Sequence, residues 1–191
     1  MNPYSLAAAF SMTVLGVIVV FLLVTTYNSI VGLLQRIDKA WANIEVALKQ
    51  RYDELPNLVY AVRDVMAYEQ GVLEEVARQR AAYQASAPVG EQAAVSIATS
   101  SAVRSLFAVV ERYPELRSHA NVVDLQAEIQ RLESLIADRR ELYNDSVYRY
   151  NTRIGQVPAV LFGWLFGWGP RPFFSAPDAV STRPEVELRQ T

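Results

Sequence analysis

Few side chains in this sequence could carry out chemistry. Cysteine is absent and His119 is the only histidine, which excludes disulfides, thiolate metal sites, cysteine nucleophiles and every mechanism that needs two histidines. The sequence also lacks the motifs G-x-S-x-G, H-E-x-x-H and G-x-x-x-x-G-K-[ST], and the Glu-x-x-His pairs of di-iron bundles. We interpret His119 as a surface residue. The sequence therefore predicts no enzyme, no cofactor and no bound metal.

Charged residues at positions expected to be buried are more informative. Arg51 and Glu69 fall on the apolar stripes of two predicted helices, and Glu133 and Arg140 share the inward face of a third. Two acids and two bases could compensate one another, and breaking a buried ion pair costs about 3–5 kcal/mol. Three interpretations remain open: a network that fixes helix register, a polar ligand pocket between helices, or solvent exposure on a slightly rotated face.

Two asparagines extend this inward polar set. Asn144 and Asn151 are seven residues apart and therefore lie on one helix face, beside Tyr143 and Tyr150. An inward asparagine in a bundle can specify register at some cost in stability. We expect these two to form hydrogen bonds between helices. The predicted buried polar network consists of Arg51, Glu69, Glu133, Arg140, Asn144 and Asn151.

The elements that must position these residues are helices. Apolar residues recur at steps of three and four, and no segment alternates with the period of a strand. Four amphipathic helices joined by short loops predict an all-α fold, an antiparallel four-helix bundle. A proline at position 56 is expected to end or kink the first helix. The predicted helices cover residues 33–55, 58–83, 91–112 and 121–154.

The N-terminus carries a long apolar run. Leu6–Val24 holds 19 consecutive uncharged residues, enough to span a bilayer, and the first charged side chain is Arg36. A cleaved signal peptide is the alternative, but it would need a basic start and a shorter apolar core. We therefore expect an uncleaved transmembrane helix that continues into the bundle as a stalk. Arg36 and Lys39 follow the span, which favours an N-terminus outside and a body in the cytoplasm.

Composition agrees with a membrane protein and argues against a nucleic-acid partner. The 191 residues carry 18 Lys and Arg against 20 Asp and Glu, a net charge of −2, while 51% of residues are hydrophobic. Proteins that bind nucleic acids concentrate basic residues on one face, and this balance gives no reason to expect that.

A second apolar segment follows the last predicted helix. Val157–Pro170 has no charge, is too short to span a bilayer, and repeats a Phe-Gly-Trp triplet. Trp favours the lipid–water boundary, and glycines four apart allow close backbone approach if the segment is helical. The segment could lie at the membrane interface, pack between protomers, or cap its own bundle. The predicted oligomer or membrane-interface residues are Phe162, Gly163, Trp164, Phe166, Gly167 and Trp168.

These segments divide the chain into four parts. Residues 1–28 form the anchor, 29–156 the helical bundle, and 157–174 the aromatic segment. Residues 175–191 are rich in Ser, Pro, Arg and Glu, which predicts a disordered tail.

Several signatures in combination resemble the LemA family. The similarity runs from Tyr27-Asn28 to Pro158 and departs at Gln50 and Tyr52, where the family tends to have Arg and a smaller or acidic residue. The motifs that carry it are Trp41, Leu48-Lys49-Gln50-Arg51, Leu55-Pro56-Asn57-Leu58-Val59, Tyr68-Glu69, Arg80, Tyr113-Pro114-Glu115-Leu116, Leu125-Gln126, Glu133-x-x-Ile136-x-x-x-Arg140-x-x-Tyr143-Asn144 and Tyr150-Asn151.

The resemblance implies a single-pass protein of the bacterial inner membrane with a helical bundle and no established enzymatic activity. Similar proteins include one linked to magnetosome membrane formation, and some occur alongside membrane proteases. From the residues and the resemblance together we expect a homo-oligomeric scaffold whose partners are the lipid bilayer, further copies of the chain and a membrane protein such as a membrane protease. The alternative is a sensor module that binds a ligand through its inward charges.

Overall fold

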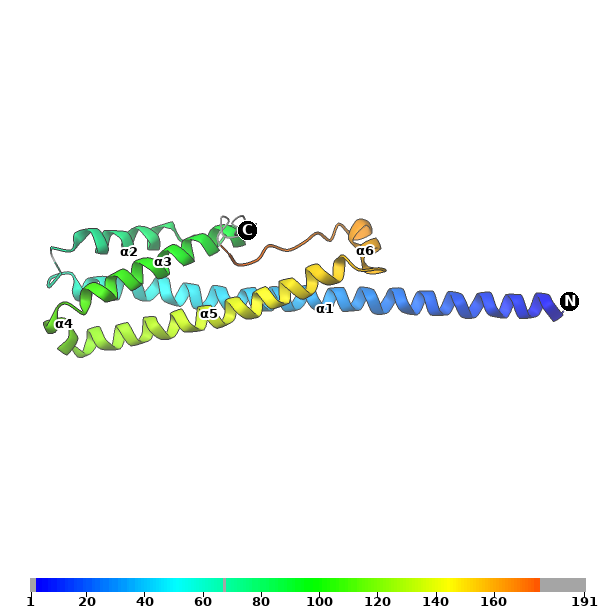
Figure 1. Ribbon diagram of the computed structural model, residues 1–191, viewed down its shortest axis with the longest axis horizontal. Coiled ribbons are helices and arrows are strands. Elements are labelled where there is room, and N and C mark those ends of the chain that lie inside the picture. Colours follow the sequence, from blue (N-terminus) through cyan, green and yellow to red (C-terminus); the bar gives the residue numbers. More distant parts are fainter. Residues whose placement is uncertain (1–2, 67, 176–191) are drawn as a thin grey trace, which may run out of the picture. The chain divides into compact units, whose positions relative to one another are not determined.

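The described structure is all-α, as predicted, with helices as its regular elements. The computed structural model describes residues 3–66 and 68–175, and no strand occurs among them (Figure 1). The tail predicted to be disordered lies, apart from Ser175, outside the described residues. The helices are α1 (Pro3–Val62), α2 (Gln70–Ala82), α3 (Val89–Val110), α4 (Pro114–Ser118), α5 (Ala120–Ile154) and α6 (Ala159–Phe166).

The first helix corrects the prediction made for Pro56. We expected the helix to end or kink there and a second helix to begin near Leu58, but α1 continues through Pro56 to Val62. The ring of Pro56 is exposed, while Leu58 and Val62 on the following turns have no exposed surface. Burial of these two side chains offsets the backbone hydrogen bond that the proline cannot donate.

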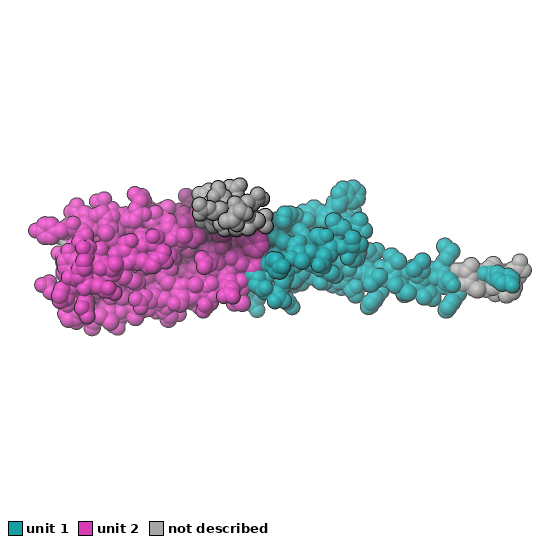
Figure 2. Space-filling view, in the orientation of Figure 1, with its two compact units in different colours: residues 1–39, 145–171 teal, residues 40–144, 172–191 magenta. Residues whose placement is uncertain are grey.

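The chain divides into two compact units, shown in different colours in Figure 2. Unit 1 comprises Met1–Lys39 and Asp145–Arg171, and unit 2 comprises Ala40–Asn144 and Pro172–Thr191. Both boundaries fall inside long helices, since α1 and α5 each contribute to both units. These units differ from the four consecutive parts expected from composition, because residues far apart in sequence pack together.

Unit 2 is an antiparallel arrangement of four helical segments. Along the chain, the second part of α1, then α2, α3 and the first part of α5 alternate in direction (Figure 1). The short helix α4 connects α3 to α5 and buries Leu116. Fully buried apolar side chains come from all four segments, including Leu48, Leu55, Val76, Ala93, Leu106, Ile129 and Leu132.

Buried positions recur every seven residues along α1 and α5. Such a repeat keeps one stripe of a helix facing its neighbours. In α1 the repeat contains one charged residue, Arg51, among apolar ones, and in α5 it includes two tyrosines. The buried positions of the repeat are Ile30, Ile37, Ile44, Arg51 and Leu58 in α1, and Val122, Ile129, Ile136, Tyr143 and Tyr150 in α5.

Unit 1 contains the apolar N-terminal part of α1, the end of α5, and α6. From Ala9 to Val24 the side chains of α1 are exposed, and α1 is long and apolar enough to cross a membrane. Helix α3 meets the same length and composition criterion, but 44% of its apolar window is buried in the protein. Burial makes α3 a core helix of unit 2, whereas the exposed stretch of α1 suggests a membrane anchor.

Candidate functional site

Arg51 lies at the centre of unit 2 and has no exposed surface. Its Nη1 donates to Glu133 Oε1 at 2.8 Å and to Ser100 Oγ at 3.0 Å. Its Nη2 donates to the Ser96 hydroxyl and to the Tyr52 hydroxyl, both at 3.0 Å. A seven-residue apolar repeat thus places this guanidinium inside the bundle, where a carboxylate and three hydroxyl groups accept from its two Nη atoms. Its Nε is buried and has no hydrogen-bond partner among the described residues.

The partners of Arg51 are themselves held in place. Ser100 Oγ donates to Glu133 Oε2 at 2.6 Å, so both carboxylate oxygens accept hydrogen bonds. The Tyr52 hydroxyl also bonds Thr99 Oγ1 at 3.0 Å, and its ring stacks on Tyr83 with centroids 4.0 Å apart. Burial, together with the neighbouring Tyr52, raises the pKa of Tyr83. The cluster connects α1, α3 and α5 and has the geometry of a register-fixing network.

Two members of the predicted network lie elsewhere. Glu69 occupies the turn before α2 and pairs with Arg112 after α3, at 3.0 Å. Arg140 is exposed, and the described residues give it no hydrogen bond or ion pair. Glu69 was predicted to lie on the buried face of the second helix. This prediction is wrong, because α2 begins only at Gln70.

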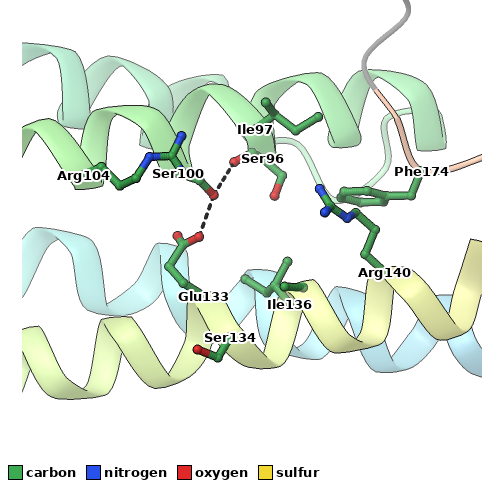
Figure 3. Close-up of a pocket in the computed structure, with 10 residues that line it drawn as sticks. Ser96, Ile97, Ser100, Arg104, Glu133, Ser134, Ile136, Arg140 and Phe174 are labelled. Atoms are coloured by element: carbon green, nitrogen blue, oxygen red, sulfur yellow. Dashed lines mark hydrogen bonds between the residues drawn. The ribbon is translucent and has the colours of Figure 1, made fainter. Parts of the chain in front are cut away.

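A pocket of about 480 Å³ opens between α3 and α5 in unit 2. Ser96, Ser100 and Glu133 form part of its wall, so it adjoins the Arg51 network. Arg104 and Arg140 lie on either side of Glu133, and the Arg140 guanidinium is next to the ring of Phe174 (Figure 3).

Asn144 holds the C-terminal segment instead of bridging helices. In unit 2 its Nδ2 donates to the Phe174 carbonyl at 3.3 Å, and its Oδ1 accepts from the Phe174 amide at 2.8 Å. The adjacent Tyr143 hydroxyl donates to the Pro172 carbonyl at 2.9 Å. The side-chain amide therefore bonds both the carbonyl and the N–H of one extended residue, as the backbone of a neighbouring β-strand does.

The same pair of contacts occurs in unit 1. Asn151 Nδ2 donates to the Arg171 carbonyl at 2.9 Å, and Asn151 Oδ1 accepts from the Arg171 amide at 2.8 Å. The Tyr150 hydroxyl donates to the Gly169 carbonyl at 3.1 Å. Burial raises the pKa of Tyr150, and Arg171 partly offsets this effect. A seven-residue step in α5, about 10.5 Å, matches a three-residue step of extended chain, about 10 Å.

Sequence analysis missed this attachment, although the residues involved were identified. The available signal was the repeated Tyr-Asn pair at 143–144 and 150–151, followed by Pro170 and Pro172, which favour an extended chain. We refer to Gly169–Phe174 as the C-terminal strap.

The aromatic segment in unit 1 has two different faces. One face contacts Tyr27 of α1: the Phe166 and Trp168 rings each lie 5.4 Å from it between centroids, and the Phe162 ring lies at 6.2 Å. The other face, which we call the outer face of α6, consists of Leu161, Trp164 and Leu165, with exposed fractions of 62%, 88% and 64%.

The two glycines of the segment permit the backbone geometry at the C-terminal end of α6. Gly167 has a φ of +67°, the left-handed conformation that ends many helices and that L side chains rarely adopt. The Trp168 amide then donates to the Gly163 carbonyl at 3.0 Å. A Cβ on Gly163 would come within 3.2 Å of the Trp168 carbonyl oxygen. The backbone that approaches Gly163 is therefore the segment's own.

His119 and the acidic residues form no metal-binding set in the part of the chain that the structure describes. His119 follows α4 and lines a shallow pocket with Asn57 and Asn121. The arrangement supplies hydrogen bonds and fixed charges rather than a nucleophile beside a base.

An apolar N-terminal helix joined to a helical bundle defines a class of membrane-anchored all-α proteins. The LemA family model matches residues 40–188, more than half of the chain, and the chain belongs to the LemA family, a membrane-associated family. No curated protein sequence matches it.

Proposed function

We propose that this protein is a membrane-anchored, non-enzymatic scaffold that self-assembles and organises membrane proteins or the membrane itself. In this proposal α1 crosses the bacterial inner membrane once. The N-terminus lies outside and the bundle lies in the cytoplasm, where it presents surfaces to a partner such as a membrane protease.

The charges of unit 1 support this orientation. Basic residues near the ends of a span remain on the cytoplasmic side. Unit 1 carries five basic and only two acidic side chains, all after the apolar span. They are Arg36, Lys39, Arg149, Arg153 and Arg171, against Asp38 and Asp145.

The outer face of α6 is the observation that carries the proposal. Tyr27 lies three residues after the predicted span ends at Val24, and its contacts hold α6 beside that part of α1. At a membrane boundary, lipid or a second copy of α6 can cover Leu161, Trp164 and Leu165, which would otherwise face water. Burying this face at about 25 cal/mol per Å² would contribute several kcal/mol to association.

The buried polar groups support a structural role. The Arg51 guanidinium is enclosed, and its carboxylate partner accepts two short hydrogen bonds. Arg51 is out of reach of a substrate, and Glu133, although it lines the pocket, already accepts hydrogen bonds with both oxygens, so the pair is better suited to joining helices than to general acid–base catalysis.

Cysteine cross-linking tests self-assembly directly, because the chain has no cysteine of its own. A Trp164→Cys variant in native membranes should form a disulfide-linked dimer on mild oxidation. Tyr68→Cys is the matched control, since Tyr68 is an equally exposed aromatic, 97% accessible, in the turn between α1 and α2. The control should remain monomeric.

Serine variants separate the two faces of the segment. Replacing Leu161, Trp164 and Leu165 with Ser should abolish oligomers in native mass measurements while the bundle keeps its cooperative unfolding. Replacing Phe166 and Trp168 should instead loosen α6 from Tyr27. A protein that is monomeric in membranes and in mild detergent, with no partner bound, would refute the scaffold.

A ligand-sensing module is the second candidate, and the pocket between α3 and α5 favours it. The pocket adjoins the Arg51 network that links three helices, so an occupant could change their packing. Because α1 continues from this network toward the N-terminus, a shift in the bundle could reach the span.

A further inference from the structure

The pocket between α3 and α5 has a positive charge that its own lining does not neutralise. Arg104 from α3 and Arg140 from α5 line it, and the described residues provide neither with a hydrogen bond or an ion pair. Glu133 is the one acidic residue among the lining residues. Its two oxygens already accept from Arg51 and Ser100, at 2.8 and 2.6 Å.

This local charge is opposite to that of the surrounding unit. Residues 40–144 contain 15 acidic and 11 basic side chains, so the bundle as a whole is acidic. Around the pocket, Arg51, Arg104 and Arg140 face a single carboxylate. A cavity with this excess of positive charge favours anions over cations and neutral molecules.

The two free guanidiniums are separated across the pocket. Figure 3 shows Arg104 on one side of Glu133, where its side chain lies along α3, and Arg140 on the other, where its side chain reaches from α5 toward α3. One small anion placed at Arg104 would leave Arg140 unpaired, so full use of the pocket needs two acidic groups. Guanidinium groups bind carboxylates and phosphates through paired N–H donors.

The pocket also offers apolar surface, with Ile97 and Ile136 between the two arginines and Phe174 beyond Arg140 (Figure 3). Ile97, Ile136 and the ring of Phe174 are part of the lining. Phe174 is 98% buried and is fixed by its backbone bonds to Asn144, so this wall is preformed. The volume of about 480 Å³ lies within the usual range of sites for small organic molecules, roughly 300–1,000 Å³.

We propose that this pocket binds a small organic dianion, with one acidic group on Arg104, the other on Arg140, and an apolar spacer against Ile97 and Ile136. The acidic groups are carboxylates or phosphates. The proposal names the ligand class for the second candidate function, ligand sensing, and is independent of self-assembly.

Titration calorimetry on the full chain in mild detergent tests the proposal. The probes are linear α,ω-dicarboxylates from succinate to suberate, the monocarboxylates of equal length, and the corresponding α,ω-bisphosphates. We expect saturable binding of diacids with an optimum spacer length and binding of monoacids about tenfold weaker or worse. Comparison of dicarboxylates with bisphosphates identifies which acidic group the site prefers.

Charge-removing variants locate the binding. Arg104→Gln and Arg140→Gln should each weaken diacid binding about tenfold or more and bring its affinity near that of the monoacid. Arg131→Gln is the matched control, since Arg131 lies on the exposed side of α5 and pairs with Glu128. The control should leave the affinity unchanged.

Three results would overturn the proposal: no diacid binds, diacids bind no better than monoacids, or the Arg104 and Arg140 variants bind as well as the unmodified chain.

Diamines and neutral diols of equal length, titrated in parallel, separate this failure from failure of the sensing function. If only such a molecule binds, and Ser100→Ala weakens it, the ligand class is wrong while sensing survives. If a diacid binds but hydrogen exchange in α1 stays unchanged, the dianion site stands and sensing fails.

Discussion

Removing the charge of Glu133 should destabilise the bundle more than removing the charge of Arg51. Arg51 has no exposed surface, whereas the Glu133 side chain is 25% exposed. A Glu133→Gln substitution keeps the size of the side chain but leaves the guanidinium buried without a counter-charge. We expect it to lower the free energy of unfolding by about 3–5 kcal/mol, the cost of breaking a buried pair.

Arg51→Met should lower the free energy of unfolding by less than Glu133→Gln does, by about 1–3 kcal/mol. Glu133 would keep the hydrogen bond from Ser100 and would remain in contact with water, and Tyr52 would keep its bond to Thr99. In the double variant no charge is left at the site, because the two replacement side chains are both neutral. We therefore expect the double variant to be more stable than Glu133→Gln alone, since replacing a buried pair with apolar groups is often close to neutral.

Denaturant unfolding of the full chain in mild detergent, followed by far-ultraviolet circular dichroism, measures these differences. Glu128→Gln is the control because it removes an exposed pair with Arg131, and it should change stability by less than about 1 kcal/mol. If Arg51→Met lowers stability as much as Glu133→Gln, or if the two effects simply add in the double variant, Arg51 and Glu133 do not form a buried pair of the kind described.

Three further predictions concern the first helix and the strap. Pro56→Ala should stabilise the protein by about 1–3 kcal/mol without changing its size in small-angle scattering, because α1 is already helical there; an elongated product would contradict this. Asn151→Ala should speed hydrogen exchange at the Arg171 amide and leave the Phe174 amide unchanged; equal exchange at Arg171 would show that Asn151 does not hold the strap. The pKa of Tyr150 is raised by burial, so its contribution to stability is complete below the ordinary tyrosine pKa of about 10 and is lost as pH rises through the higher folded value. Tyr150→Phe should flatten this alkaline loss in denaturant titrations, and an unchanged profile would assign the loss to another group.

Periodicity predicted the third and fourth bundle helices well because packing in a bundle is itself periodic, whereas the helix predicted over 58–83 was wrong. The last helix was expected over 121–154 and is found at Ala120–Ile154. Arg51 and Glu133 were both predicted to face inward from their spacing, and the structure joins them. Spacing along one helix indicates which residues share a face. This is sufficient to predict a contact when both partners lie on the buried faces of neighbouring helices.

The remaining contacts could not be predicted from the helical periodicity of the sequence. Asn144 and Asn151 were expected to bond other helices, but their partners are backbone groups about 20 to 30 residues later in an extended segment. The end of α1 depended on whether burial of Leu58 and Val62 outweighs the cost of Pro56, a balance that local rules for proline do not include. The separate roles of Trp164 and Trp168 also required knowing where Tyr27 lies.

We propose that copies of this chain assemble in the membrane through the outer face of α6. Stepwise photobleaching of a fluorescently tagged full chain in native nanodiscs counts the subunits in each particle. We predict more than one bleaching step per particle for the unmodified chain, and a single step when Leu161, Trp164 and Leu165 are replaced by Ser. Single steps for the unmodified chain, or unchanged step numbers in the variant, would rule out assembly through this face.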